Sequence, residues 1–243
     1  MPPGPPKRSE MPEWVEPTRF VILCLGRTGS THLQSMLDFH SQARCHAEIF
    51  GQGKPPTFAA SEDADPKRFL DRMLTATDQR AIGFKLPLES VRLTPDAGRL
   101  VREDNAMAAI RLSRRNRLAQ IVSRQMLTAT GVSQSIFGNY GETTVRLEPR
   151  GCLAALDRIE VDEAALDELC LDHPTFRIDY EELGEEERLI ELQRFLGLEP
   201  EPLRSWYERL RTRSLAETVS NWDEVVRALR GTPHERFLTE AAP

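Results

Sequence analysis

Two glycines, one arginine and three hydroxyl side chains are crowded into residues 26–31 of this chain. Glycine lets the backbone turn sharply and come close to a ligand. The first N–H groups of a helix, the hydroxyls and the arginine can all donate hydrogen bonds to an anion. We therefore expect residues 26–31, called here the anion loop, to bind a phosphate-like group. The alternative, an ordinary turn capped by Ser or Thr, needs neither the second glycine nor the arginine.

The elements on either side would position the anion loop. Residues 20–25 are an unbroken apolar run, which is typical of a strand buried on both faces of a parallel sheet. Beyond the loop, Leu33, Met36 and Leu37 recur at helical spacing. The loop should thus join the carboxyl end of a strand to the start of a helix, where the helix dipole places about half a positive charge.

A second strand, loop and helix follow further along the chain. The small apolar residues 106–110 predict the strand, Arg115 stands in the loop, and an apolar face at helical spacing comes next. Ser123 lies eight residues beyond Arg115, just over two helical turns at ~3.6 residues each, so one ligand could touch both. Planar Arg donors and a hydroxyl suit a phosphate. The alternative is a solvated basic patch for nucleic acid, which the acidic balance of the chain disfavours.

Candidate acid–base groups stand between the two loops. His46 and Glu48 follow the first predicted helix, where an open α/β sheet returns to the edge at which ligands bind. A carboxylate or imidazole there could take a proton from a hydroxyl. Lys85 lies near the end of the largely apolar stretch 81–87, and a cation at a strand end suits a transferring anionic group. The alternative is that all three are ordinary solvated residues.

The anion loop departs from two familiar phosphate loops and resembles a third. It lacks the lysine of the ATPase pattern G-x-x-x-x-G-K-[ST] and the third glycine of dinucleotide loops. Its sequence, Gly-Arg-Thr-Gly-Ser-Thr-His-Leu, resembles the 5′-phosphosulfate loop of sulfotransferases that use PAPS, 3′-phosphoadenosine 5′-phosphosulfate. Bacterial carbohydrate and small-molecule members often carry an arginine in this loop, as here. Arg115, Asn116 and Ser123 match the 3′-phosphate motif of the same family.

The resemblance implies a fold and a reaction. The fold would be α/β, with a P-loop-like, mostly parallel sheet flanked by helices. The reaction would move a sulfuryl group from PAPS to a hydroxyl of a small-molecule or carbohydrate acceptor, leaving adenosine 3′,5′-bisphosphate, without a metal. Two other interpretations stay open: a nucleotide-dependent kinase or NTPase of P-loop type, and a non-catalytic nucleotide-binding protein.

The resemblance also assigns roles to residues. The catalytic residues would be Arg27, Glu48 and Lys85, with Glu48 as the general base and His46 as the alternative base. The donor would be bound by Arg27, Thr28, Gly29, Ser30, Thr31, His32, Arg115 and Ser123.

Composition bounds the setting of this chemistry. The proline-rich residues 1–17 are predicted to be a flexible lead-in, and residues 18–243 a single domain. A net charge of −6 disfavours nucleic acid and anionic membranes as partners. Four cysteines without C-x-x-C spacing, no long apolar segment and no signal-peptide core predict a cytoplasmic enzyme of bacterial or cytosolic type. The sequence is compatible with a homodimer and does not fix the oligomeric state.

The C-terminal half is less informative. Residues 138–151 are turn-rich and are predicted to face the acceptor, while residues 160–171 and 203–213 are predicted to be helices, the second with Trp206 in the core. Asn221 and Trp222 are similar to an Asn–aromatic pair of bacterial and Golgi-type sulfotransferases. Which late segment covers the adenine and the 3′-phosphate is left open by the sequence.

Overall fold

A computed structural model describes residues 16–52, 56–75, 78–134, 138–208 and 213–239 of the chain. Most of the predicted lead-in, residues 1–15, therefore lies outside the described residues. The first strand begins at Thr18 and contains the apolar run expected at 20–25, apart from its last residue.

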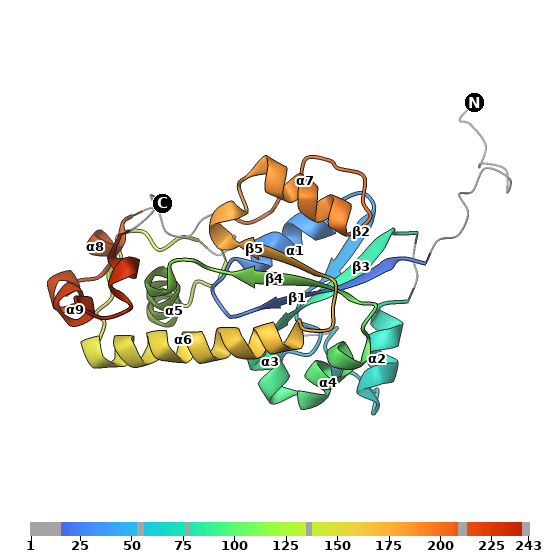
Figure 1. Ribbon diagram of the computed structural model, residues 1–243, viewed down its shortest axis with the longest axis horizontal. Helices are drawn as coiled ribbons and strands as arrows, with labels where there is room; N and C mark the ends of the chain where they lie inside the picture. The colour runs from blue at the N-terminus through green and yellow to red at the C-terminus, as the bar shows by residue number, and fades with distance from the viewer. Residues whose placement is uncertain (1–15, 53–55, 76–77, 135–137, 209–212, 240–243) are drawn as a thin grey trace, which may run out of the picture.

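A five-stranded parallel sheet forms the centre of the molecule (Figure 1). Its strands, in chain order, are β1 (Thr18–Cys24), β2 (Ala43–His46), β3 (Ala81–Pro87), β4 (Ala108–Ser113) and β5 (Thr175–Asp179). They lie in the order β2-β3-β1-β4-β5, and every neighbouring pair runs parallel. The prediction of an α/β fold with a parallel sheet is confirmed.

Helices cover both faces of the sheet because β1 is apolar on both. Its residues Phe20 and Ile22 belong to the core beneath α1 (Ser30–Phe39) and α7 (Glu186–Phe195). The alternating Val21 belongs to the larger core on the opposite face. Figure 1 shows α1 and α7 above the sheet and the long helix α6 below it. Since all five strands point the same way, the loops that follow them gather at one edge, where ligands bind in such folds.

The remaining helices complete that larger core and the carboxyl edge of the sheet. They are α2 (Pro66–Met73), α3 (Leu88–Leu93), α4 (Pro95–Glu103), α5 (Arg117–Thr130), α6 (Pro149–Leu169), α8 (Leu215–Thr218), α9 (Trp222–Leu229) and the 3₁₀ turns η1 (Phe58–Ala60), η3 (Tyr180–Glu182) and η4 (Glu235–Leu238). Helix α6 begins well before the predicted residue 160, because the Glu148 carboxylate caps its first turn and Pro149 occupies the first helical position.

The helix predicted at 203–213 is wrong for the part of it that the structure describes. Residues 203–208 form no helix or strand, with a bend at Trp206, and residues 209–212 lie outside the described residues. The main chain at Trp206 and Tyr207 bonds instead to side chains of α1: Trp206 N donates to Ser35 Oγ, and Tyr207 O lies 2.9 Å from His32 Nδ1. Trp206 is 69% exposed rather than in the core, and its ring contacts Phe39.

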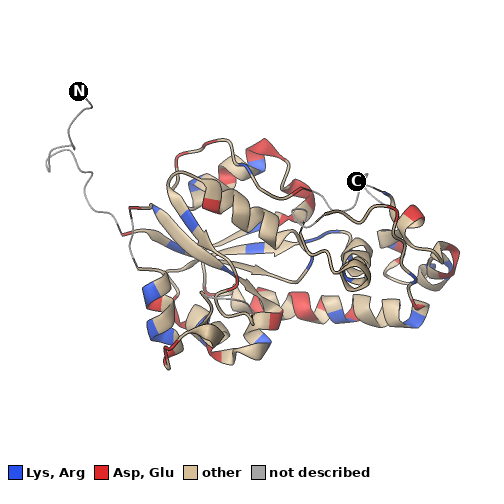
Figure 2. Ribbon diagram, turned by 180° about the vertical axis from the view of Figure 1, so that it is seen from behind, with Lys and Arg blue, Asp and Glu red and all other residues tan. Residues whose placement is uncertain are grey.

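Charged residues of both signs are interspersed over the helices (Figure 2). Within the described residues, no helix combines the length and apolar character needed to cross a membrane. Cys24, Cys45, Cys152 and Cys170 are all free thiols in buried positions.

Candidate functional site

The anion loop has the backbone that close ligand approach requires. Arg27 and Gly29 both have left-handed conformations, with φ of 68° and 81°. A Cβ on Gly29 would lie 2.5 Å from the Tyr180 ring, so both φ and space exclude other residues there. Helix α1 begins directly after Gly29, and no side chain among the described residues caps it. Its first N–H groups therefore have no side-chain partner at the cap, as far as the structure describes the chain, and could donate to an anion.

Two of the loop hydroxyls point into the protein. Thr28 is fully buried, and its Oγ1 donates to Leu25 O at 2.8 Å, so its hydroxyl is taken up within the loop. Ser30 is also buried and lies in hydrogen-bonding contact with the Cys24 thiol. Burial raises the pKa of that thiol to about 11, against the attraction of Lys85. Both hydroxyls thus stabilise the bend of the loop.

The third hydroxyl, that of Thr31, contacts Lys85, which also pairs with Glu48. Lys85 Nζ donates to Thr31 Oγ1 at 3.0 Å and pairs with Glu48 Oε1 at 2.9 Å. The Lys85 side chain is only 7% exposed, whereas that of Glu48 is 44% exposed. The carboxylate compensates the buried ammonium and remains accessible to a ligand from solvent. The structure therefore brings together the ends of β2, β3 and the anion loop.

His46, the alternative base, is engaged elsewhere. Its Nε2 lies 2.9 Å from Met73 O at the end of α2, so Nε2 carries the proton that this carbonyl accepts. Partial burial lowers the pKa of the imidazole. Between the two candidates, Glu48 is the one bonded to Lys85.

Arg27 connects the anion loop to helix α5. Its Nε donates to Ser123 Oγ at 3.1 Å, its Nη1 to Ser133 O at 3.2 Å and its Nη2 to Tyr140 Oη at 3.0 Å. The two residues predicted to bind opposite ends of a ligand are thus in direct contact. Sequence reasoning missed Ser133 and Tyr140, because they lie in an irregular segment whose folding back onto Arg27 has no local sequence pattern.

The loop before α5 lies beside the anion loop. Arg114 Nη1 donates to Arg27 O at 3.3 Å, and its guanidinium stacks 4.5 Å above the Tyr180 ring, which also covers Gly29. On the α5 side, Gln120 Nε2 donates to Gly26 O at 2.8 Å. Neither Arg114 nor Gln120 is part of the sequence-predicted site.

Arg115 is held by carboxylates that the sequence reasoning did not foresee. Its Nε donates to Asp179 Oδ2 and its Nη2 to Glu182 Oε1, both at 2.6 Å. The hydrogen bond with Asp179 is the main reason that the pKa of Arg115 is raised. Both acids come from the end of β5 and from η3, and the Arg115 side chain remains 56% exposed.

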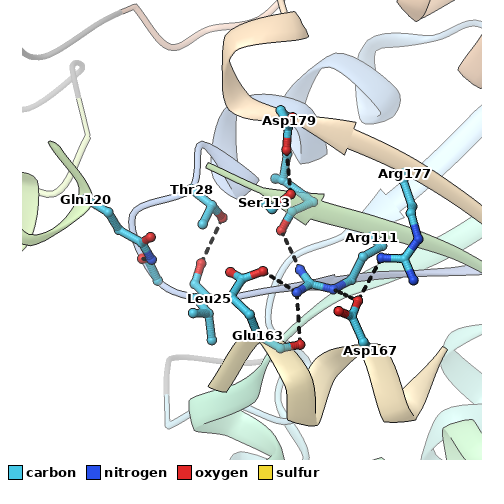
Figure 3. Close-up of polar contacts among 11 residues, drawn as sticks. Leu25, Thr28, Arg111, Ser113, Gln120, Glu163, Asp167, Arg177 and Asp179 are labelled. Atoms are coloured by element: carbon cyan, nitrogen blue, oxygen red, sulfur yellow. Dashed lines mark hydrogen bonds and ion pairs between the residues drawn. The ribbon is translucent and has the colours of Figure 1, made fainter. Parts of the chain in front are cut away.

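An ion cluster around the buried Arg111 connects β4 to helix α6 (Figure 3). Arg111 is 2% exposed, and its Nε donates to Asp167 Oδ1 at 3.1 Å. Its Nη2 donates to Glu163 O at 3.2 Å and also to the Glu163 carboxylate. At the end of the strand, Ser113 Oγ donates to Asp179 Oδ1 at 2.6 Å, so the acid that holds Arg115 is itself held by β4.

The described residues were also compared with the requirements of a metal site. Among the described residues, no group of three or more His, Cys, Asp or Glu side chains is arranged to hold a metal ion.

Comparisons with known proteins bear on the fold. The chain is similar to a sulfotransferase from Alicyclobacillus acidocaldarius, with a TM-score of 0.51 and 13% identity, over 93% of this chain and 96% of that chain. It also aligns with a mouse sulfotransferase complexed with PAP, with a TM-score of 0.49 and 14% identity, over 95% of this chain and 91% of that chain. No family model matches, and no curated protein matches significantly. The fold is thus that of a solved sulfotransferase structure, as the anion loop predicts.

Proposed function

We propose that the chain is a PAPS-dependent sulfotransferase that moves a sulfuryl group from PAPS to a hydroxyl of a small-molecule or carbohydrate acceptor. The observation that carries the proposal is the joining of two predicted phosphate seats through the contact between Arg27 and Ser123. Two seats side by side suit a nucleoside with phosphates at both its 5′ and 3′ ends. The fold shared with a solved sulfotransferase supports the same assignment.

The donor is proposed to lie across the two strand–helix loops. The open N–H groups of α1, together with Arg27 and Thr31, would hold the phosphosulfate end. Arg115 and Ser123 would hold the 3′-phosphate, with Arg114 between the two seats. Thr28 and Gly29 would contact the donor through their main chain, and Ser30 through its N–H group at the start of α1. His32 would line the same end of α1, on the side where its ring contacts Tyr207 O.

The chemistry would centre on Glu48 and Lys85. Glu48 takes the proton of the acceptor hydroxyl, whose oxygen attacks sulfur as the bond between sulfur and the bridging phosphate oxygen breaks. Negative charge develops on that bridging oxygen and leaves with adenosine 3′,5′-bisphosphate. Lys85 Nζ, held by Thr31 and Glu48, is positioned to stabilise this charge, and so is Arg27.

Nucleotide binding gives the first test. Adenosine 3′,5′-bisphosphate should raise the melting temperature of the protein more than ATP with Mg²⁺ does. The reverse order would favour a kinase or NTPase and would contradict the proposal.

Calorimetry of two variants tests the role of Arg115. Arg115→Ala should weaken bisphosphate binding at least tenfold, because it removes a charged contact to the phosphate. Arg99→Ala, which changes an exposed arginine of α4, should bind the bisphosphate like the wild type.

Transfer gives the second test. Incubation with radiolabelled PAPS and a library of carbohydrate and small-molecule hydroxyls should yield a labelled sulfate ester. Glu48→Gln should lower turnover about 10²- to 10⁴-fold, because the proton acceptor is lost. Bisphosphate affinity should change much less, because the Gln oxygen can still accept from Lys85. Full activity in that variant would remove Glu48 from the mechanism. Bisphosphate binding without transfer to any acceptor would favour a non-catalytic nucleotide-binding protein.

A further inference from the structure

A carboxylate occupies main-chain donors at the start of helix α5. Glu181 Oε2 accepts from Arg115 N at 3.1 Å, and Glu181 Oε1 accepts from Asn116 N at 3.3 Å. Consecutive main-chain N–H groups ahead of a helix are donors that suit an anion. Here they lie at the base of the Arg115 side chain, where the proposed 3′-phosphate seat begins.

The neighbouring acids have a different role. Asp179 and Glu182 form a reciprocal capping box, in which the Glu182 side chain accepts from Asp179 N at 2.8 Å. Asp179 also accepts from Ser113 Oγ at 2.6 Å. These bonds hold both carboxylates in place before they contact Arg115, so they form a fixed frame that orients its guanidinium.

Glu181 lacks such anchoring. Within the described part of the chain, its side chain makes only the bonds to Arg115 N and Asn116 N, and both are longer than the bonds of the frame. The same part of the chain provides no acceptor for Arg115 Nη1. The seat therefore has one exchangeable anion and one guanidinium nitrogen still available for another.

We propose that the Glu181 carboxylate is an internal competitor for the 3′-phosphate, which must displace it from Arg115 N and Asn116 N to bind. The inference rests on the proposed function, because it concerns the donor of that reaction. Three carboxylates around one guanidinium also repel a phosphate dianion. Donor affinity is thus reduced by the fraction of molecules in which Glu181 occupies the seat.

The experiment compares two nucleotides on three proteins by calorimetry. Glu181→Gln should bind adenosine 3′,5′-bisphosphate about five- to tenfold more tightly than the wild type, since one negative charge near the phosphate is removed. Its affinity for adenosine 5′-monophosphate, which has no 3′-phosphate, should not change. Glu185→Gln removes the same charge from an exposed residue that is not among the acids acting on Arg115, and should bind both nucleotides like the wild type.

The outcomes separate this inference from the proposed function. Wild-type binding of the bisphosphate with equal or weaker binding by Glu181→Gln would overturn the role of Glu181 and leave the proposed function standing. An equal gain in Glu185→Gln would assign the effect to net charge and would also overturn it. If neither the wild type nor Glu181→Gln bound the bisphosphate, both proposals would fail.

Discussion

Arg111 provides the sharpest test of the energetics of the fold. We expect Arg111→Met to lower the free energy of unfolding by about 3 kcal/mol, at the low end of the cost of stranding one member of a buried ion pair. The low end applies because the Asp167 side chain is 46% exposed and can be rehydrated, whereas that of Glu163 is only 14% exposed. Domains of this kind are stable by about 5–15 kcal/mol, so the change should be large but not abolish folding.

The pH dependence of that cost has a definite sign. Burial raises the pKa of Glu163, against the attraction of Arg111. Without Arg111 the pKa rises further, so the variant loses stability as pH climbs above the ordinary carboxyl value. For Asp167, burial raises the pKa, but Arg177 and Arg111 together lower it below 3.8. The stability that Asp167 adds to the wild type is therefore present above pH 3.8 and is lost as the pH falls through the lowered pKa. The difference between wild type and variant should therefore be larger at about pH 7.5 than at about pH 5.

Urea unfolding followed by circular dichroism measures both effects. The matched control is Arg99→Met, in which an exposed arginine of α4 loses its bonds to Asp96 and Glu103. Its unfolding free energy should stay within the error of the wild-type value. The double variant Arg111→Met/Glu163→Leu should recover part of the loss, because no charge is then left stranded beside β4. Equal stability of Arg111→Met and Arg99→Met would refute the reasoning.

Three shorter predictions concern the anion loop and two residues that contact it, Lys85 and Cys24. Lys85→Met should lower sulfuryl transfer about 10²- to 10³-fold, with bisphosphate affinity changed much less; a loss confined to nucleotide binding would contradict its catalytic role. Gly29→Ala should cost about 1–3 kcal/mol of unfolding free energy, because of its positive φ and the Tyr180 ring, whereas Gly184→Ala, with open space, should be tolerated. Cys24, whose pKa is raised to about 11 by burial, should resist iodoacetamide in the native protein by mass spectrometry. Rapid native labelling would show that this pKa is not raised.

The elements that the sequence predicted well are those with local causes. The apolar runs of β1, β3 and β4 allow little else than buried parallel strands, and the glycines of the anion loop require a turn. Glu48 and Lys85 could be placed at one sheet edge because parallel strands end together, and the structure joins them at 2.9 Å. Their roles in catalysis remain predictions.

What could not be predicted depends on contacts between distant segments. The apolar spacing around Trp206 indicates a helix, yet side chains of α1 take up the main-chain groups of this segment. Likewise, nothing near Arg115 in the sequence announces Asp179 and Glu182, which reach it only because β5 lies beside β4. The sequence around Arg115 therefore contains no pattern that would indicate carboxylates contributed by a neighbouring strand.

The bonds of Arg27 connect the anion loop to α5 and to the stretch between α5 and α6. Ser133 and Tyr140 lie between α5 and α6, in a stretch that overlaps residues 138–151, which were predicted from the sequence to face an acceptor. A chimaera that replaced this stretch with one from another enzyme would also release two of the three groups that fasten Arg27. Under the proposed function, a graft that changes the acceptor-facing stretch must therefore supply new hydrogen-bond acceptors for the Arg27 guanidinium.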